Sequence, residues 1–492
     1  MESSLLEGFS NALTLTNLGY CFVGSVLGTV VGVLPGLGPA ATTAILLPLT
    51  GYLPPTGAMI MLFGIIYGAM YGGSTTSILM NVPGESSSMV TCIDGYKMTK
   101  QGRAGEALAI AAIGSFIAGT AGVMLLSVVG PTLASIGLSF GPPEFFALVL
   151  FGFTTILSFT GGNIFKALIA GLVGMLLAGV GLDPLSGRDR LVFGISSLYA
   201  GLDVVTMLMG LFGIAEVLSS AEEGIVSIYQ GKLGHWISRG KELKKGLAAS
   251  VRGTVSGLAL GLIPGMVTTI ITFVAYDVEK RFSKHPERFG TGMIEGVAGP
   301  EASNNAAVQA GIIPLMTLGI PTQPIFAIML AALMIHGLQP GPLLFSEHGK
   351  FTWTVIASMY IGNVMLLVLN LPLVGLWARL CYVPYRILGP FILAICFIGA
   401  YSLRNNMFDV WICIIFGIVG YMMKKRDWPA APLILGFILG DLIEKYLRSS
   451  LQMSGGSITI FFSRPIALLF IGLAVLSVIF SRRMWKTASK RE

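Results

Sequence analysis

The sequence predicts an all-α polytopic membrane protein made of two inverted-topology repeats with broken or re-entrant helices. Only 11% of the 492 residues are charged and 54% are hydrophobic, whereas a soluble domain carries about 25% charged residues. Apolar runs of about 20 residues, the length that spans a bilayer, recur along most of the chain. Proline and glycine interrupt the apolar pattern in two similar regions, which indicates a duplicated unit.

Uninterrupted apolar stretches predict ordinary spanning helices. With the two interrupted regions, 14–84 and 246–338, they predict about 11 to 12 transmembrane helices. The uninterrupted stretches are about 106–129, 143–158, 167–181 and 204–219 in the first half, 353–376, 387–401, 408–423 and 432–447 in the second half, and 465–480 at the end.

Basic residues predict the orientation. None precedes Lys97, and they then gather at 97–103, in the central loop, at 424–426 and in the tail. Loops rich in lysine and arginine face the cytoplasm, so we expect a periplasmic N-terminus and a cytoplasmic C-terminus. The net charge of +7 is therefore an orientation signal, and the expected surroundings are a lipid bilayer, with no nucleic acid bound.

Three short motifs occur twice, in the same order and with slowly increasing spacing, as loops of unequal length would produce. Loop 97–103 is basic, whereas its counterpart near 340–352 has one lysine and lies outside by helix count, so the copies are predicted to be inverted. The motif pairs are VGVLPGLG (31–38) with LGLIPGMV (260–267), LMNVPGE (79–85) with TLGIPTQ (317–323), and GLVG (171–174) with GIVG (417–420).

The repeats predict the domain organisation. A first transmembrane repeat covers 10–219, a cytoplasmic connecting loop 220–245, and a second, inverted repeat 246–447; an extra C-terminal helix covers 465–480. Inverted repeats with broken helices are typical of secondary transporters, whose site lies near the midplane where the repeats meet. The alternative is a duplication without a transport function.

Polar residues accompany the interruptions, and we expect breaks at 35–38, at 72–77 with 81–85, at 264–265, and at 299–305 with 319–323. Pro35-Gly36 and Pro264-Gly265 are the expected tips of a symmetry-related pair of re-entrant or broken helices. A half-helix that begins at the midplane points free N–H groups into a cavity and favours an anion. Hydroxyl and amide groups can serve an anion or Na⁺, or can bond their own helix and merely aid packing. The candidate substrate contacts are Pro35, Gly36, Gly38, Thr42, Thr43, Ser74, Thr75, Thr76, Pro264, Gly265, Thr268, Thr269, Asn304 and Asn305.

A second group is expected to hold a co-transported cation, either Na⁺ or H⁺. Glu295 and Glu301 have no basic residue beside them, and an intramembrane carboxylate is costly unless it is paired or solvated, so either could be a proton or cation site; the alternative is a loop-end carboxylate at the interface. No metal site, other cofactor or catalytic centre is predicted, because the cysteines form no CxxC motif and the histidines are scattered. The coupling-ion candidates are Asn81, Glu301, Ser303 and Thr317.

Taken together, the motifs resemble the large membrane subunit of tripartite tricarboxylate transporters, the TctA family, over nearly the whole chain. One departure is Val267, which occupies the place that Gly38 has in the first copy. The resembling motifs are GVLPGLG (32–38), YGGSTTS (71–77), NVPGE (81–85), GVAGPEASNN (296–305), LGIP (318–321), KKR (424–426), PAAP (429–432) and LGFILG (435–440).

The resemblance implies a substrate-translocating subunit in a bacterial inner membrane. A periplasmic solute-binding protein would deliver a carboxylate, a small four-helix membrane subunit would accompany this chain, and an ion gradient would drive uptake. Two alternatives remain. A stand-alone cation antiporter would work without a binding protein, and a membrane-embedded enzyme would need a convergent nucleophile, base or metal cluster, which the sequence does not offer.

Overall fold

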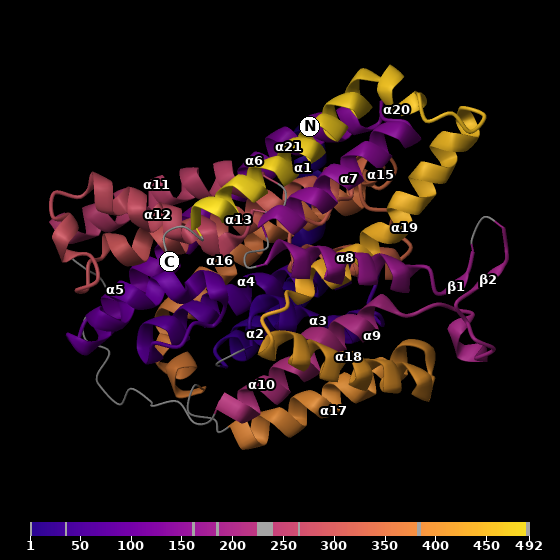
Figure 1. Ribbon diagram of the computed structural model, residues 1–492. Helices are drawn as coiled ribbons and strands as arrows, with labels where there is room; N and C mark the ends of the chain where they lie inside the picture. Colours follow the sequence, from indigo (N-terminus) through magenta and orange to yellow (C-terminus); the bar gives the residue numbers. More distant parts are fainter. Residues whose placement is uncertain are drawn as a thin grey trace.

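The computed structural model describes residues 2–34, 37–159, 163–183, 186–223, 240–263, 266–380 and 385–488 (Figure 1). In the first half the helices are α1 (Glu2–Ala12), α2 (Leu15–Gly32), α3 (Pro39–Thr50), α4 (Pro55–Met80), the 3₁₀ helix η1 (Ser86–Ser88), α5 (Met89–Lys100), α6 (Ala104–Gly137), α7 (Pro142–Phe159), α8 (Ile164–Ala178), the 3₁₀ helix η2 (Ser196–Leu198), α9 (Val204–Leu208), the π-helix η3 (Met209–Ile214) and α10 (Ala215–Glu223).

The second half is helical in the same way. It contains α11 (Lys241–Gly261), α12 (Thr268–Phe282), the 3₁₀ helix η4 (Pro286–Arg288), α13 (Glu295–Leu318), α14 (Pro324–Ile335), α15 (Pro342–Ser346), α16 (Gly349–Leu380), α17 (Tyr385–Arg404), α18 (Met407–Lys425), α19 (Ala430–Met453), α20 (Ile460–Ser463) and α21 (Pro465–Ala488). The described strands are β1 (Gly181–Leu182) and β2 (Asp189–Arg190), a short antiparallel hairpin that the sequence had not indicated.

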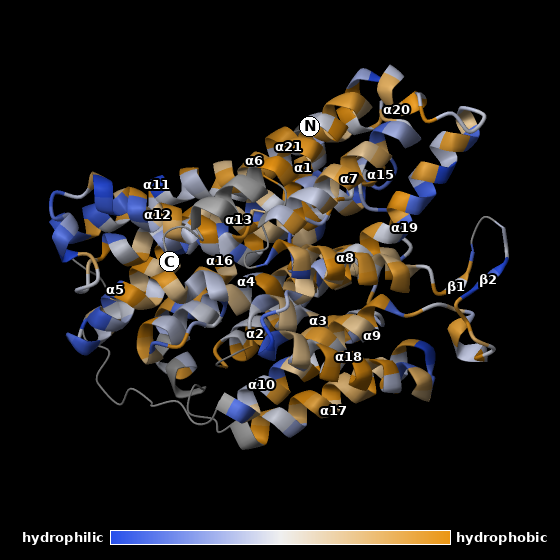
Figure 2. Cartoon of the chain, viewed as in Figure 1, coloured by the Kyte–Doolittle hydropathy of each residue, from blue (hydrophilic) through white to orange (hydrophobic). Residues whose placement is uncertain are grey.

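The all-α polytopic membrane class is confirmed. Among the described residues, seven helices are long and apolar enough to cross a membrane, and five shorter helices are apolar. Their burial differs widely, since 94% of the apolar window in α4 is buried but only 28% of that in α17. Hence α4 lies at the centre of the bundle and α17 at its edge. Figure 2 shows hydrophobic residues along the bundle and hydrophilic ones gathered at its two ends.

The buried helices α4 and α13 each pair with a parallel helix, and each pair is held together by glycines at every fourth position. Gly24, Gly28 and Gly32 of α2 lie on α4, where a Cβ at Gly28 would be 2.3 Å from the Ile65 oxygen. In the second half Gly253, Gly257 and Gly261 of α11 lie on α13 in the same way, and a Cβ at Gly257 would be 2.4 Å from the Ser303 oxygen. Close backbone approach through such small-residue rows is a common membrane packing mode.

The two pairs run in opposite directions. Ser74 of α4 contacts Glu301 of α13, and Tyr67, two turns earlier on α4, contacts Gln309, two turns later on α13. Contacts that advance on one helix and recede on the other require antiparallel helices. This arrangement is what two inverted copies would produce, although the repeat boundaries themselves remain predictions.

The predicted breaks at 72–77 and 299–305 are wrong. Helix α4 continues to Met80, and the hydroxyls in this stretch donate to carbonyls of their own helix, as Ser77 does to Gly73 at 2.9 Å; these buried hydroxyls are therefore hydrogen-bonded without a break in the chain. Helix α13 likewise passes through Pro300. The breaks come later, at Asn81 and Gly319, which both adopt left-handed backbone conformations (φ 59° and 72°) and end α4 and α13.

The predicted breaks at 35–38 and 264–265 do separate two helices. Helix α2 ends at Gly32 and α3 begins at Pro39, whereas α11 ends at Gly261 and α12 begins at Thr268. The expected tips Pro35-Gly36 and Pro264-Gly265 lie outside the described residues. The helices on both sides of each predicted break are therefore present, and they are shorter than α4 and α13.

Each half also packs its outer helices against the other half. Gly171 and Gly174 of α8 lie against α19, while Gly417 and Gly420 of α18 lie against η3 and the start of α10. These are the glycines of the third duplicated motif. The two halves are thus interlocked through equivalent helices.

Candidate functional site

Glu301 of α13 lies at the junction of the two antiparallel pairs and is fully buried. Its Oε1 accepts hydrogen bonds from Ser74 Oγ at 2.5 Å, Asn305 Nδ2 at 3.3 Å and Ser115 Oγ at 3.4 Å. Its Oε2 accepts one from Thr91 Oγ1 at 3.1 Å. Helices α4, α5, α6 and α13 thus each contribute a polar group. None of the ion pairs among the described residues involves Glu301.

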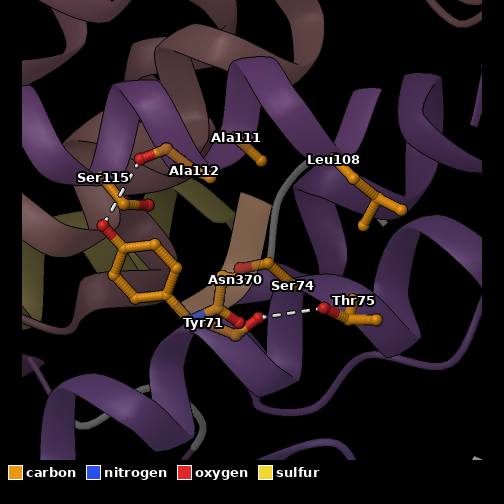
Figure 3. A pocket seen from close by; sticks show the side chains of 8 residues that line it. All are labelled: Tyr71, Ser74, Thr75, Leu108, Ala111, Ala112, Ser115 and Asn370. Atoms are coloured by element: carbon orange, nitrogen blue, oxygen red, sulfur yellow. Dashed lines mark hydrogen bonds between the residues drawn. The ribbon is translucent and has the colours of Figure 1, made fainter. Parts of the chain in front are cut away.

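A small cavity adjoins this cluster and offers about 20 Å³ to the centre of a water molecule, enough for about one water. Figure 3 shows Tyr71 extending from α4 toward α6, where its hydroxyl donates to the Ala112 oxygen at 3.3 Å. Ser74 and Ser115, which also bond Glu301, border the same cavity. Its lining residues are Tyr71, Ser74, Thr75, Leu108, Ala111, Ala112, Ser115 and Asn370.

A second carboxylate lies on the neighbouring face of α13. Asn304 Nδ2 donates to Glu85 Oε1 at 2.7 Å, while Asn304 Oδ1 is buried and has no hydrogen-bond partner. Glu85 precedes η1 and lies beside the start of α3, since a Cβ at Gly38 would be 3.5 Å from Glu85 Cβ. The consecutive residues Asn304 and Asn305 therefore connect two polar clusters, one around Glu85 and one around Glu301.

The other predicted residues are distributed as follows. Ser74, Asn305 and Glu301 share one cluster, Thr75 borders the cavity, and Asn304 with Gly38 belongs to the Glu85 side. Three hydroxyls bond only carbonyls of their own helices: Thr43 to Pro39, Thr76 to Gly73 and Ser303 to Pro300. Thr42 is buried, and its hydroxyl has no partner. Pro35, Gly36, Pro264 and Gly265 lie outside the described residues.

Some candidates lie apart from Glu301. Thr317 bonds the Ile313 oxygen near the far end of α13, roughly 24 Å along the helix from Glu301 at 1.5 Å per residue. Asn81 is an exposed cap at the end of α4. Thr268 and Thr269, at the start of α12, are half-exposed.

Sequence reasoning missed four contributors: Thr91, Ser115, Tyr71 and Asn370. Ser115 is a single serine in the apolar α6, and nothing in one sequence separates it from a packing residue. Thr91 lies in the short helix that follows the break after Asn81. Partners from separate helices become visible only when the helices are placed side by side.

A different carboxylate fixes the neighbouring loop. Asp94 of α5 is fully buried and accepts hydrogen bonds from the backbone amides of Gly290, Gly292 and Met293 and from the Tyr276 hydroxyl. This set ties the loop before α13 to α5 of the first half. Its four donors fill the carboxylate's acceptor positions, which marks Asp94 as a structural anchor.

The arrangement brings neutral donors, two carboxylates and the start of a helix together in the bundle interior. No group of three or more histidine, cysteine, aspartate or glutamate side chains in the described part of the chain is placed to hold a metal ion. One of the two carboxylates can bind a proton, and the hydroxyl and amide groups can bind a small cation or the carboxylate of a solute.

The chain is similar to uncharacterised proteins of two organisms. An uncharacterised 52.8 kDa protein of Agrobacterium vitis, named for the TAR-I ttuC′ 3′ region, is 46% identical over 97% of this chain and 95% of its own length. A second Agrobacterium vitis protein, from the TAR-II ttuC′ 3′ region, is 47% identical over 43% of this chain and 87% of its own. An uncharacterised protein of Methanocaldococcus jannaschii is 24% identical over 42% of this chain and 49% of its own.

No solved structure matches the chain. The family model described as "Tripartite tricarboxylate transporter TctA family" matches residues 18–435. This range includes nearly all of both helix pairs that pack through glycine rows, and the buried polar clusters between them. The chain therefore belongs to the tripartite tricarboxylate transporter TctA family.

Proposed function

We propose that this chain is the substrate-translocating large membrane subunit of a secondary, ion-gradient-driven importer of carboxylates that depends on a binding protein. A periplasmic solute-binding protein would deliver the substrate, and a small four-helix membrane subunit would complete the complex. The observation that supports this best is the buried polar junction at which α4 and α13 meet in opposite directions. Transporters built from inverted repeats bind their substrates at such junctions.

The polar groups at this junction suit a carboxylate. Ser74, Thr75 and the partnerless Thr42 hydroxyl can donate hydrogen bonds, and the start of α3 adds free backbone N–H groups at its positive dipole end. The described lining of the cavity contains no lysine or arginine. A bound anion would therefore depend on these neutral donors together with a co-bound cation, either Na⁺ or H⁺.

The charges at the two ends support a bacterial inner-membrane orientation with the N-terminus in the periplasm and the C-terminus in the cytoplasm. Arg103 bonds Glu106 and Glu242 and also the Gly292 oxygen, so the basic loop at 97–103, the start of α11 and the loop before α13 meet at one end. The β1–β2 hairpin lies at the opposite end (Figure 1). Under the positive-inside rule the first end faces the cytoplasm.

The test is uptake of radiolabelled di- and tricarboxylates into proteoliposomes that contain this chain, the small subunit and the binding protein. Na⁺ and H⁺ gradients are collapsed separately. We expect uptake of at least one carboxylate that requires both the binding protein and a gradient, and that is independent of ATP. Gradient-driven cation exchange without a binding protein would instead support the stand-alone antiporter, and the absence of all carboxylate uptake would contradict the proposal.

A further inference from the structure

The side chains that hydrogen-bond Glu301 are donors, whereas a site for a metal cation requires oxygen ligands. Each described side chain that hydrogen-bonds the carboxylate is a neutral donor, and the shortest contact, from Ser74 Oγ to Glu301 Oε1, measures 2.5 Å. The same Ser74 hydroxyl has a second acceptor, the Met70 oxygen, at 3.1 Å. Ser74 Oγ–H can therefore donate its hydrogen bond to either acceptor without any movement of heavy atoms.

We infer that Glu301 is the binding site of a proton that is transported with the substrate, and that Ser74 is the hydroxyl that adapts to its presence. When Glu301 is ionised, Ser74 Oγ–H donates to Glu301 Oε1. When a proton binds Oε1, the new carboxylic O–H donates to Ser74 Oγ, and Ser74 donates to Met70. The proton comes from solvent and returns to it, and no other bond changes. This inference rests on the proposed function.

Both states leave the cluster hydrogen-bonded, which is what a carboxyl group must achieve if it is to gain and lose a charge in a buried site. An ionised carboxylate without donors would be very costly there. Here four donors from Ser74, Asn305, Ser115 and Thr91 stabilise the charged form. In the neutral form the Ser74 hydroxyl rotates, and rotation of a hydroxyl hydrogen is fast.

The orientation of Asn305 disfavours a metal cation in the same place. Its Nδ2 donates to Ser115 Oγ at 2.8 Å and to the Glu301 main-chain oxygen at 3.1 Å, besides Oε1. A main-chain carbonyl can only accept, so the amide must present its NH₂ group to the cluster. Na⁺ takes oxygen ligands, and an NH₂ group directed at the carboxylate occupies the position that such a ligand would need.

The charged and titratable surroundings are few. Tyr71 from α4, Cys92 from α5 and Glu85 from the loop before η1 are close enough to interact electrostatically with Glu301. Helix α6 contributes the neutral Ser115. On α11, Arg252 is held by Glu279 at 3.0 Å and is not shared with Glu301.

The cavity provides the first step of a proton route. Ser74 and Ser115 both border it and both bond Glu301 Oε1. One water in this space could pass a proton to or from Ser74. Asn370 of α16 also borders the cavity, so the route lies where α4, α6 and α16 meet.

The first experiment detects the proton directly and needs no substrate. The full chain is reconstituted in lipid, and infrared difference spectra between acidic and alkaline pH are recorded in sodium and in choline salts. Wild type should show a protonated-carboxyl band that Glu301→Gln removes and Glu295→Gln, a buried acid two turns earlier on α13, retains. An unchanged band in Glu301→Gln overturns the inference, as does a titration midpoint of the wild-type band that differs between sodium and choline salts.

The second experiment separates this inference from the proposed function. Glu301→Gln resembles the protonated state, so the complete tripartite system carrying it should still exchange labelled for unlabelled carboxylate. It should lose the accumulation that a pH gradient drives, whereas Glu295→Gln should keep both activities. Loss of exchange in a Glu301→Gln protein that still folds would make Glu301 a substrate ligand and overturn the proton assignment. If wild type exchanges no carboxylate, the proposed function fails while the infrared result still decides the proton site.

Discussion

Tyr67 of α4 and Gln309 of α13 are 242 positions apart in the chain, yet the Tyr67 hydroxyl donates to Gln309 Oε1 at 2.9 Å. Both side chains are buried. With the Ser74–Glu301 contact two turns away, this bond fixes the antiparallel register between the two central helix pairs. The first prediction concerns its energetic contribution.

Tyr67→Phe should destabilise the protein by about 1–3 kcal/mol, because Gln309 Oε1 loses its donor while it stays buried. The free energy of unfolding in detergent micelles measures this loss. The double variant Tyr67→Phe/Gln309→Leu should recover part of it, since no buried acceptor is then left unpaired. Purely additive losses would show that the two side chains are not coupled.

The glycine rows predict matched packing defects in the two halves. Gly28→Val and Gly257→Val should each cost about 1–3 kcal/mol or more from overpacking, because their Cβ atoms would lie 2.3 and 2.4 Å from carbonyl oxygens of the neighbouring helix. Size-exclusion yield of folded protein is the measurement. Gly19→Val, also on α2, is the control, because its Cβ would have no atom within 4 Å. Normal yields of both Gly28→Val and Gly257→Val would contradict the close packing of α2 on α4 and of α11 on α13.

Thr75→Val should weaken transport without reducing the amount of folded protein. Thr75 borders the cavity, and its hydroxyl bonds only the Tyr71 oxygen at 3.2 Å in the structure, so it remains available to a substrate. Loss of one buried hydrogen bond to substrate costs about 1–3 kcal/mol, a roughly 5- to 150-fold fall in kcat/KM for uptake. Thr155→Val is a suitable control, since Thr155 on α7 makes the same kind of back-bond away from the cavity. A fall in folded protein with normal specific transport would indicate a packing role instead.

Cysteine labelling should place the two ends of the bundle on opposite sides of the membrane. In a cysteine-free variant, Ser196→Cys should react with an impermeant maleimide added from the periplasm, and Lys100→Cys only after permeabilisation. Both positions are exposed. The reverse pattern would invert the proposed orientation.

Asp183 should hold the β1–β2 hairpin to the bundle. It is 4% exposed and accepts from Arg190 at 2.6 Å and from Arg448 at 3.0 Å. Asp183→Asn removes the charge that joins the two guanidinium groups, so limited proteolysis within 186–200 should become several-fold faster. Asp189→Asn, at an exposed position of the same hairpin, should cleave at the wild-type rate. Equal rates for all three proteins would show that the ion pairs do not secure the hairpin.

The sequence was sufficient for the membrane class and for the duplicated motifs, because apolar length and repeated proline-glycine patterns are local properties. It misplaced the breaks at 72–77 and 299–305. In isolation, glycine and hydroxyl residues favour an interruption of a helix. Here Ser74 and Ser77 donate hydrogen bonds to carbonyls of their own helix, and Gly72 packs closely against the C-terminal end of α2. Tertiary packing thus overrode the local preference.

The polar cluster was only half predictable. Glu301 and Asn305 stood out because carboxylates and amides are rare in apolar runs. Ser115 and Thr91 did not, because a lone hydroxyl in a membrane helix usually bonds its own backbone. Which hydroxyls face Glu301 depends on how α5 and α6 lie against α13, and one sequence contains no direct record of that contact.

The interlocked glycines have a consequence for how the protein is made. Gly171 and Gly174 of α8 lie against α19, a segment synthesised more than 250 residues later. Until α19 emerges from the ribosome, that surface of α8 must face lipid or a membrane chaperone. If the chain is divided between α10 and α11, the first fragment should therefore lack the α19 surface against which α8 packs and should be degraded. Expression of the second fragment in the same cell should restore the amount of the first.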